Sequence, residues 1–362
     1  MKTVQTKAPG KLYIAGEYAV VEPGQAAVIT AVNRFVSARI SPSSTDFGSI
    51  HSVGFTQKPV KWQRLNNQVE LENASDSLKY VVSAIQTTEA YLVENGLSLV
   101  PFDLEIESEL DDKDGKKLGL GSSGAVTVAT VEALLEFYDV QLSKLLVYKL
   151  SVLAQMNLGI NSSFGDIAAS TYTGWIEYAS FNRDYVRKFR LEHSLTETIE
   201  TYWPKLMIRK MRVHNKVNFL TGWTGSPASS HNLVGAVQER KEQTNKEYAH
   251  FLKESFASVT LLVIGLEEGN PTKIKDAVNR NRKALLEMGK NTNVVIETPL
   301  LRNLCEIVWK HGGAAKTSGA GGGDSGIAFL FAKKHIKPVS EEWKKNGITP
   351  LSLRVYKENN KK

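Results

Sequence analysis

The sequence predicts an α+β protein of two domains. Its 362 residues exceed the size of one ordinary domain, and 42% of them are hydrophobic, which allows a core in each half. Segments with strand character and segments with helical spacing both occur, but they do not alternate one for one. A doubly wound sheet would require that alternation, so we expect two α+β domains, covering residues 1–200 and 201–362.

The first half combines long strands with apolar helices. Residues 4–40 predict a strand, a turn at Glu22-Pro23-Gly24-Gln25 and a second strand, and residues 41–73 predict loops with short strands. Apolar and acidic side chains alternate in residues 102–107, as in a strand with one solvent-exposed face. Apolar periodicity predicts helices near 78–92, 125–138 and 147–158.

The domain boundary is expected between residues 180 and 215, in a variable, charged stretch that follows a strand at 171–179. Beyond it, helices are expected across 232–290, with a break at Gly269-Asn270-Pro271, and again at 300–311. Strands are expected at 217–222, 327–331 and 348–356.

The charge of the chain favours small anionic ligands. The formal net charge is +7, but the cations are spread along the sequence. The only short basic cluster of the kind that binds nucleic acids lies at the C-terminus, at Lys357, Lys361 and Lys362. A solvent-exposed tail explains this cluster better. We therefore expect no nucleic-acid partner.

The sequence also favours a cytoplasmic protein. Its single cysteine, Cys305, excludes an intrachain disulfide and lies at helical spacing with leucines, as a buried structural thiol would. Residues 1–7 lack the apolar run of a signal peptide. The longest apolar run, 259–266, is too short to span a bilayer, so no membrane partner is expected.

The first glycine-rich loop, Gly119-Leu120-Gly121-Ser122-Ser123-Gly124, leads into the apolar helix of 125–138. Backbone N–H groups at the opening of a helix bind anions. No lysine follows the glycines, so this is not a Walker loop. The groups expected to neutralise the phosphate charge are then the helix N-terminus, a metal ion, and Lys116 or Lys117. The hydroxyl of Ser122 or Ser123 can serve as a ligand to Mg²⁺. A simple helix cap is the alternative.

A second glycine-rich loop spans residues 316–324. Five glycines fall within residues 319–326, and so many glycines are costly in conformational entropy. A backbone that must wrap around a ligand explains this cost better than a flexible turn before a strand.

Asp166 follows the serine-rich segment 161–163. A carboxylate there can orient or deprotonate the attacking oxygen in phosphoryl transfer, or it can simply begin a helix. A catalytic carboxylate needs a cation nearby. Lys11, directly after Pro9-Gly10 in an apolar strand, is the candidate, with an ordinary solvated lysine as the alternative.

These motifs, in this order, resemble the superfamily of galactokinase, homoserine kinase, mevalonate kinase and phosphomevalonate kinase. The likeness rests on Pro9-Gly10-Lys11 followed by Gly16-Glu17, on residues 119–123 and on residues 318–323, and so extends over nearly the whole chain. Within the superfamily, residues 161–166, 222–231 and 316–326 resemble the bacterial phosphomevalonate kinases most.

The resemblance implies an ATP- and Mg²⁺-dependent phosphorylation of (R)-5-phosphomevalonate to (R)-5-diphosphomevalonate, in the mevalonate route to isoprenoids. It implies a ribosomal protein S5 domain 2-like N-terminal domain, a ferredoxin-like C-terminal domain and an active site in the cleft between them. The oligomeric state, expected to be monomer or weak homodimer, does not follow from it.

The resemblance also assigns site residues by position. Lys11 and Asp166 are the expected catalytic pair, and Ser123 the expected Mg²⁺ ligand. The residues assigned to the nucleotide are Lys116, Gly119, Leu120, Gly121, Ser122, Ser123 and Gly124. Those assigned to the acceptor are Lys11, Tyr18, Ser162, Ser163, Ser229, Ser230, His231, Ser318, Gly319, Ala320 and Gly321.

One position departs from the related mevalonate kinases, which carry a glutamate metal ligand eleven residues before the active-site aspartate. Here that position is the neutral Gln155, so no carboxylate metal ligand is predicted. Because phosphomevalonate is already largely ionised near neutral pH, Asp166 is expected to position the acceptor more than to remove a proton.

Three alternatives remain open at this stage. Mevalonate kinase would phosphorylate an alcohol and would need a true base. Diphosphomevalonate decarboxylase is related, but no segment is specific to it. A ligand sensor of the same fold would lack catalysis, and the joint presence of Lys11, Ser123 and Asp166 argues against it.

Overall fold

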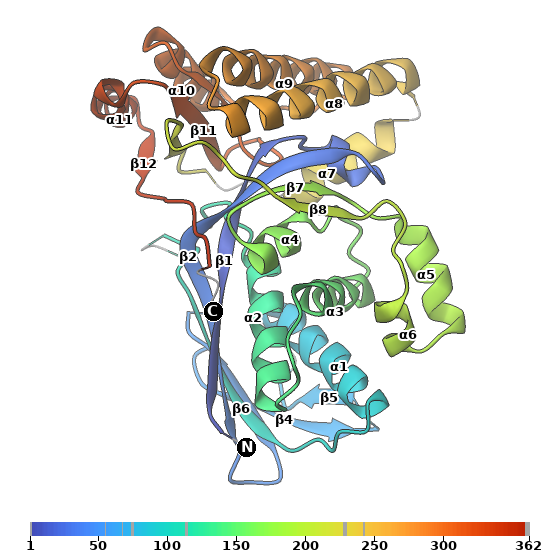
Figure 1. Ribbon diagram of the computed structural model, residues 1–362. Coiled ribbons are helices and arrows are strands. Elements are labelled where there is room, and N and C mark those ends of the chain that lie inside the picture. Colours follow the sequence, from blue (N-terminus) through green and yellow to red (C-terminus); the bar gives the residue numbers. More distant parts are fainter. Residues whose placement is uncertain are drawn as a thin grey trace.

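The computed structural model describes residues 2–54, 56–66, 68–73, 76–112, 115–226, 230–241 and 243–358, excepting the side chains of Ser230 and His231. The chain forms two β-sheets, one in each half, with helices packed on both (Figure 1). This two-domain α+β organisation agrees with the expected fold class.

The large sheet belongs to the N-terminal domain and has the strand order β5-β4-β3-β6-β2-β7-β8, with β1 paired to β2. Its pairs are antiparallel except for β3 with β6. The long β1–β2 hairpin slips register between Pro9 and Lys11 and again between Tyr13 and Ala15. The strands are β1 Val4–Ala15, β2 Ala26–Pro42, β3 Gly48–Ser52, β4 Val60–Leu65, β5 Gln68–Leu71, β6 Phe102–Ser108, β7 Trp175–Ala179 and β8 Met207–Lys210.

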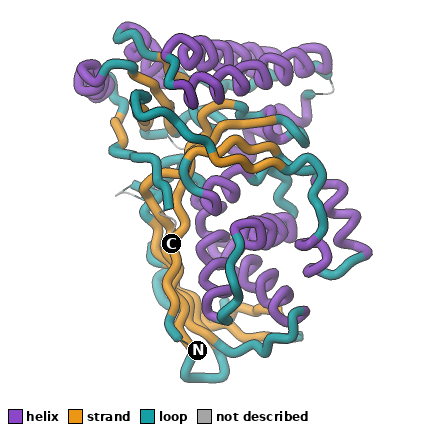
Figure 2. The backbone as a smooth tube through the Cα atoms, viewed as in Figure 1, coloured by secondary structure: helices purple, strands orange, loops and turns teal. Residues whose placement is uncertain are grey.

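Helices cover one side of this sheet, where the tube view shows them gathered beside a continuous layer of strands (Figure 2). Helix α2 packs on β1, β2, α1, α3 and α4 and buries most of its residues, as its apolar sequence predicts. The helices of this half are α1 Lys79–Glu94, α2 Ser122–Phe137, α3 Lys144–Asn157, α4 Gly165–Tyr172, α5 Arg183–Glu192 and α6 Leu195–Glu200, with single turns η1 Ala19–Val21 and η2 Asp76–Leu78.

The C-terminal domain has a four-stranded antiparallel sheet of order β10-β11-β9-β12. With helices between β9 and β10 and between β11 and β12, this is the β-α-β-β-α-β arrangement of ferredoxin-like domains, as the resemblance implied. The elements are β9 Asn218–Trp223, α7 Ser230–Arg240, α8 Asn245–Glu268, α9 Pro271–Asn291, α10 Pro299–Lys310, β10 Ala314–Thr317, β11 Ser325–Leu330, η3 Lys333–His335, α11 Ile336–Lys345 and β12 Thr349–Leu351.

The two halves are joined at more than one place. Strand β8 still pairs with β7 in the large sheet, and β9 is the first strand of the small sheet. After β12 the chain returns to the first domain, where Val355 bridges Val32 and the N–H of Tyr356 donates to the carbonyl of Ala31. The domain boundary at residues 200 and 201 stays a prediction.

Two strand predictions were wrong at their ends. Thr171 and Tyr172 belong to α4, because the chain turns only at Thr173 and Gly174, which have positive φ values of 57° and 71°. The last strand covers only Thr349–Leu351, and most of the predicted range 348–356 lies outside it. The helix break at 269–271 is confirmed, since Gly269 ends α8 in the left-handed conformation and Pro271 begins α9. Cys305 is buried, as expected.

Helix α8 corrects the expectation that no apolar segment is long enough to span a bilayer. Among the described residues, it is the one helix long and apolar enough to cross a bilayer by length and composition. It packs along α9 and also touches β1, β2 and η1, and 44% of its apolar stretch is buried (Figure 1). These contacts explain its apolar sequence as that of a core helix.

Glu132 of α2 makes stability depend on pH. Burial raises the pKa of its carboxyl from 4.5 to about 7, although Lys144 lies 3.7 Å away. The folded state therefore holds this proton more tightly than the unfolded state, and the resulting stabilisation is lost as pH rises from 4.5 through about 7.

We expect Glu132→Gln to become more stable than the wild type by roughly 1–3 kcal/mol as pH rises through this window, and nearly equal below it. Thermal melts at about pH 4 and about pH 8 measure the difference. The exposed Glu107→Gln is the control, and parallel curves for wild type and Glu132→Gln would contradict the assignment.

Candidate active site

Lys11 and the first glycine-rich loop are in direct contact. The backbone N–H of Lys11 donates to the carbonyl of Leu120 at 2.8 Å, and its ammonium donates to the carbonyl of Gly119 at 3.0 Å. The register slip of β1 at Pro9 and Lys11 frees this N–H from the regular ladder. Strand β1 thus carries the predicted catalytic lysine to the start of α2.

The glycines of this loop are needed where Lys11 lies. Gly119 and Gly121 have φ values of 75° and 77°, which favour glycine. A Cβ on Gly121 would come within 2.7 Å of Lys11 Cε. Gly121 is also the N-cap residue of α2, and it offers no side chain to the first N–H groups of the helix. In the part of the chain that the structure describes, the N-cap therefore leaves these groups open to an anion.

Asp166 lies against the same helix start. It is the second residue of α4, and a Cβ on Gly124 would come within 2.7 Å of Asp166 Oδ2. Its carboxylate accepts hydrogen bonds from its own backbone N–H and from that of Ile167. Asp166 thus begins a helix, as one interpretation of the sequence expected, and it also faces the first glycine-rich loop. Its role in phosphoryl transfer stays a prediction.

Charge interactions join Lys11 to three carboxylates. Burial lowers the pKa of Lys11, and Asp166, Asp324 and Glu17 oppose that shift. Burial raises the pKa of Asp166, and Lys11 together with the helix N–H groups opposes it. The lysine and the aspartate thus stabilise each other's charged form in a place with little water.

The serine-rich loop is organised by tyrosines. Ser163 Oγ lies 2.9 Å from the Tyr13 hydroxyl and accepts the N–H of Gly165 at 3.3 Å, while the Tyr178 hydroxyl donates to the Ser163 carbonyl. Ser162 Oγ accepts the N–H of Phe164 at 3.2 Å. The two predicted acceptor-binding serines therefore also shape their own loop.

The third motif packs on the first. Ser318 Oγ donates to the carbonyl of Tyr13 at 2.8 Å, and the Tyr18 hydroxyl donates to the carbonyl of Ala320 at 2.6 Å. A Cβ on Gly321 would lie 2.2 Å from the Ile296 carbonyl oxygen. Gly319, in contrast, has no described atom within 4 Å of the place where its Cβ would lie. The predicted acceptor residues of both motifs are thus brought together.

Some predicted residues are not placed in this cluster. Lys116 is exposed in the charged loop, where its backbone N–H donates to Asp112. Leu120 is buried, and it contributes its carbonyl to Lys11. Ser229 lies outside the described residues, as do the side chains of Ser230 and His231.

Sequence reasoning missed Asp324 and Tyr13 as site residues. A Cβ on Gly119 would come within 2.9 Å of the Asp324 carboxylate, and the carbonyl of Asp324 accepts from the Thr224 N–H and hydroxyl at 2.9 Å. Tyr13 places its ring 5.4 Å from the Lys11 ammonium. The signal available for Asp324 was its position directly after the glycines 321–323.

The metal question centres on Ser123 and Gln155. The Gln155 amide donates to the Ser123 carbonyl and to Thr127 Oγ1, both at 3.1 Å. The Ser123 hydroxyl makes no hydrogen bond among the described residues, which leaves it available to a ligand. The described part of the chain also holds no group of three or more His, Cys, Asp or Glu suited to a metal. A hydroxyl oxygen can serve as a ligand to Mg²⁺, and Ser123 stays the predicted ligand.

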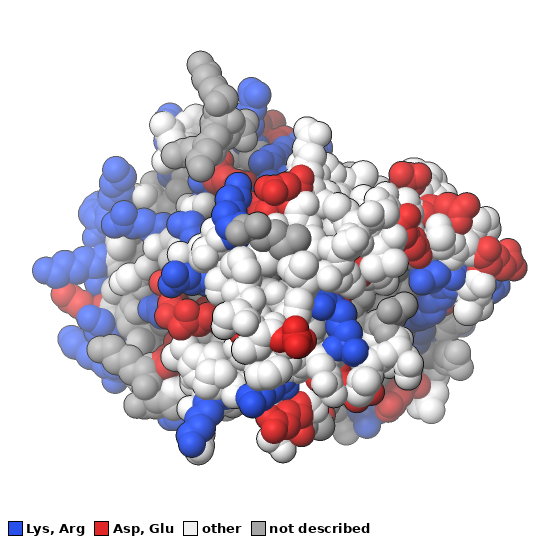
Figure 3. Space-filling model, turned by 90° about the horizontal axis from the view of Figure 1, so that it is seen from below, with Lys and Arg blue, Asp and Glu red and all other residues white. Residues whose placement is uncertain are grey.

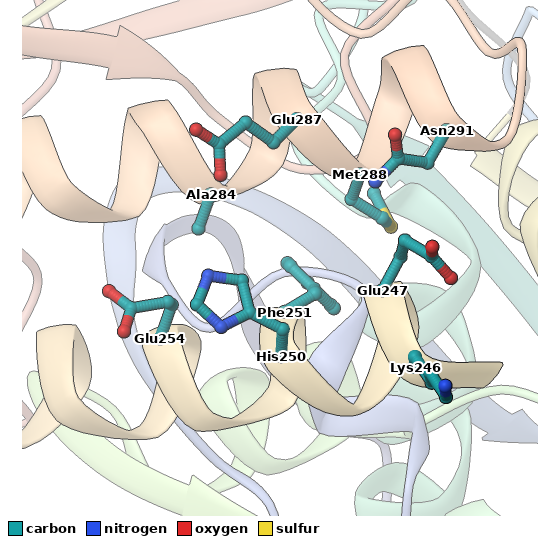
Figure 4. Close-up of a pocket in the computed structure, with 9 residues that line it drawn as sticks. All are labelled: Lys246, Glu247, His250, Phe251, Glu254, Ala284, Glu287, Met288 and Asn291. Atoms are coloured by element: carbon teal, nitrogen blue, oxygen red, sulfur yellow. The ribbon is translucent and has the colours of Figure 1, made fainter. Parts of the chain in front are cut away.

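A surface groove lies away from the three motifs. It measures about 250 Å³, lies between α8 and α9, and has Phe251, Ala284 and Met288 as its apolar floor with Glu247 and His250 on its rim (Figure 4). Its lining includes no residue of the three motifs. On the face seen in Figure 3, basic side chains predominate along the left edge, the middle is largely uncharged, and acidic and basic side chains lie together at the right.

Comparison with known proteins assigns the family. The chain matches the GHMP kinase N-terminal domain over residues 79–174 and the GHMP kinase C-terminal domain over residues 262–349. It is 36% identical to the phosphomevalonate kinase of Streptomyces sp. (strain CL190), and the match covers 97% of each chain. The chain belongs to the phosphomevalonate kinase family.

Solved structures agree with this family. A Lin0012 protein from Listeria innocua superposes with a TM-score of 0.93, 35% identity and 98% coverage of both chains. The Streptococcus pneumoniae phosphomevalonate kinase in complex with phosphomevalonate and AMPPNP gives a TM-score of 0.86 and 32% identity, over 98% of this chain and 100% of that one.

The close approach of Asp166 to α2 predicts a sharp effect at Gly124. Alanine favours helices over glycine by about 1 kcal/mol, but here its methyl group would push Asp166 away from the loop. We expect Gly124→Ala to lower kcat by roughly 10²-fold, because a displacement of about 1 Å at a reacting group has that cost. Steady-state assays together with thermal melts measure both effects.

Gly235→Ala is the matched control. Gly235 also lies within a helix, α7, and no described atom stands within 4 Å of the place that the added methyl group would occupy. It should leave kcat unchanged. Equal kcat values for both variants would show that Asp166 does not depend on this contact.

Proposed function

We propose that this protein transfers the γ-phosphoryl group of ATP to the 5-phosphate of (R)-5-phosphomevalonate, giving ADP and (R)-5-diphosphomevalonate. The observation that carries the proposal is the convergence of Lys11, Asp166 and the open N-terminus of α2, in a chain that is similar along its whole length to phosphomevalonate kinases. The products would serve the mevalonate route to isoprenoids.

The residues fit a reaction between two anions. Both substrates carry phosphate groups, so the site must supply positive charge. The N–H groups at the start of α2 and the ammonium of Lys11 meet at Gly119 and Gly121, where the nucleotide phosphates would lie. Mg²⁺, when bound, neutralises phosphate oxygens, and Ser123 would hold it.

Asp166 would orient the reacting groups instead of removing a proton. The acceptor phosphate has a second pKa near 6, so its oxygen is largely ionised near neutral pH and requires no strong base. Asp166 faces Lys11 and the start of α2, and its charge stabilises the buried ammonium. We infer that Asp166 orients Lys11 toward the transferred group and supports the charge of that lysine.

Mevalonate kinase is the second candidate, because one observation favours it. Burial raises the pKa of Asp166, as suits a general base that accepts a proton from an alcohol. The identity of the relatives weighs against this function, since the 36% and 32% identical proteins are both phosphomevalonate kinases.

The remaining expectations belong to the same proposal. We propose a cytoplasmic enzyme with small-molecule substrates, no nucleic-acid or membrane partner, and a monomeric or weakly dimeric state.

An ADP-release assay with Mg-ATP tests the acceptor directly. We expect turnover with 5-phosphomevalonate and little with mevalonate. Asp166→Asn and Lys11→Met should each lower kcat by roughly 10²–10³-fold, while the exposed Asp184→Asn should not. Turnover with mevalonate instead would make the second candidate correct, and turnover with neither acceptor would refute the proposed reaction.

A magnesium titration tests Ser123. We expect Ser123→Ala to raise the Mg²⁺ concentration that gives half-maximal rate by about tenfold, because one oxygen ligand is lost. Its neighbour Ser122→Ala serves as the control and should respond less. An unchanged Mg²⁺ requirement in Ser123→Ala would place the metal elsewhere.

A further inference from the structure

A buried ion pair links the first and third motifs. Lys316 Nζ lies 2.5 Å from Glu17 Oε1, and the two side chains are 0% and 2% exposed. Glu17 lies in the turn after β1, and Lys316 is the third residue of β10, so the contact joins the two domains. Lys316 Nζ also donates to the carbonyl of Thr317 at 2.6 Å.

Stability alone is a poor explanation for this pair. Removing two charges from water costs free energy that their attraction offsets only with good geometry and full hydrogen bonding. Glu17 Oε2 is buried and has no hydrogen-bond partner among the described residues. An apolar pair of similar size would stabilise the contact at least as well, so a role in fixing geometry is the better explanation.

The pair lies between two contacts of the predicted acceptor site. Lys316 stands two residues before Ser318, whose hydroxyl donates to the Tyr13 carbonyl. Glu17 stands directly before Tyr18, whose hydroxyl donates to the Ala320 carbonyl. A charge contact between these two hydrogen bonds fixes how segment 316–320 lies on segment 13–18.

The turn that carries Glu17 needs such support. Gly16 has a φ of 89°, and a Cβ there would lie 2.4 Å from the Ala26 carbonyl oxygen. Tyr18, which is not glycine, has a φ of 61° and a ψ of −51°. Residues in sparsely populated conformations persist only when their surroundings hold them. The Lys316 ammonium holds this turn from the other domain.

We propose that Glu17 and Lys316 are positioning residues that hold segments 13–18 and 316–320 in the arrangement that binds the phosphorylated acceptor. This inference rests on the proposed function for the identity of the acceptor. Neither residue needs to touch a substrate, because both act through Tyr18, Ser318 and Ala320. Glu17 also acts on the charge of Lys11, so Lys316→Met is the variant that isolates the contact between the two segments.

The test compares Glu17→Gln, Lys316→Met and the double variant. We expect each single variant to lower the Tm, because it leaves a buried charge without its partner. Each should also raise the KM for 5-phosphomevalonate by about tenfold or more while the affinity for a fluorescent ADP analogue stays within about twofold. The double variant should recover Tm but not the acceptor KM. If the double variant recovered both the wild-type Tm and the wild-type KM for 5-phosphomevalonate, the pair would have only a structural role and the proposal would be overturned.

Arg64→Met is the matched control. Arg64 pairs with Glu89 at 2.5 Å, with side-chain exposures of 19% and 6%, on β4 and α1 away from the three motifs. It should lower Tm without changing the acceptor KM. A tenfold KM increase in this variant as well would show that loss of stability alone explains the effect.

Hydrogen exchange provides a readout that does not depend on the substrate. In both single variants and in the double variant, amides of residues 16–20 and 317–321 should exchange faster, while those of 125–135 in α2 should not. If wild type fails to turn over 5-phosphomevalonate, the proposed function is wrong, and the exchange result still decides whether the pair holds the two segments. Unchanged exchange in all three variants would overturn the inference.

Discussion

Lys11 is half-buried at the start of α2, and keeping its ammonium charged constrains the structure around it. A lysine removed from water loses its proton unless carboxylates and carbonyls replace the lost hydration. Here the Gly119 carbonyl accepts from it, and Asp166, Asp324 and Glu17 act on its charge. These three acids come from α4, from the third motif and from the turn after β1, so the lysine requires both domains to be in place.

The local parts of this arrangement could be predicted from the sequence. The apolar run of α2 and the glycines before it predict a buried helix with an open N-terminus, and the structure has both. The place of Asp166 in the first turn of a helix, after a short serine-rich loop, could likewise be predicted because loop and helix signals are local. The GHMP kinase family and the ferredoxin-like sheet order follow from motifs that span the chain.

The long-range contacts could not be predicted in the same way. Glu17 and Lys316 are 299 positions apart, and nothing in the neighbourhood of either residue indicates its partner. Asp324 meets Gly119 through the packing of two domains, which no periodicity reports. The glycines of the third motif also differ in a way that the composition does not show. A side chain on Gly321 would meet Ile296, whereas one on Gly319 would meet no described atom within 4 Å. Only the folded structure shows which glycines are required because neighbouring atoms leave no room for a side chain, and which leave room for a ligand.

The neutral Gln155 has a physical explanation in this setting. Its amide donates to the Ser123 carbonyl and to Thr127 Oγ1, and the carbonyl would repel a carboxylate in this place. The proposed acceptor brings its own phosphate charge to a site where Asp166 and Asp324 already lie near Lys11. A further buried acid beside Ser123 would add repulsion against both substrates. A neutral amide that fixes the Ser123 backbone therefore suits the proposed phosphorylated acceptor better than an alcohol.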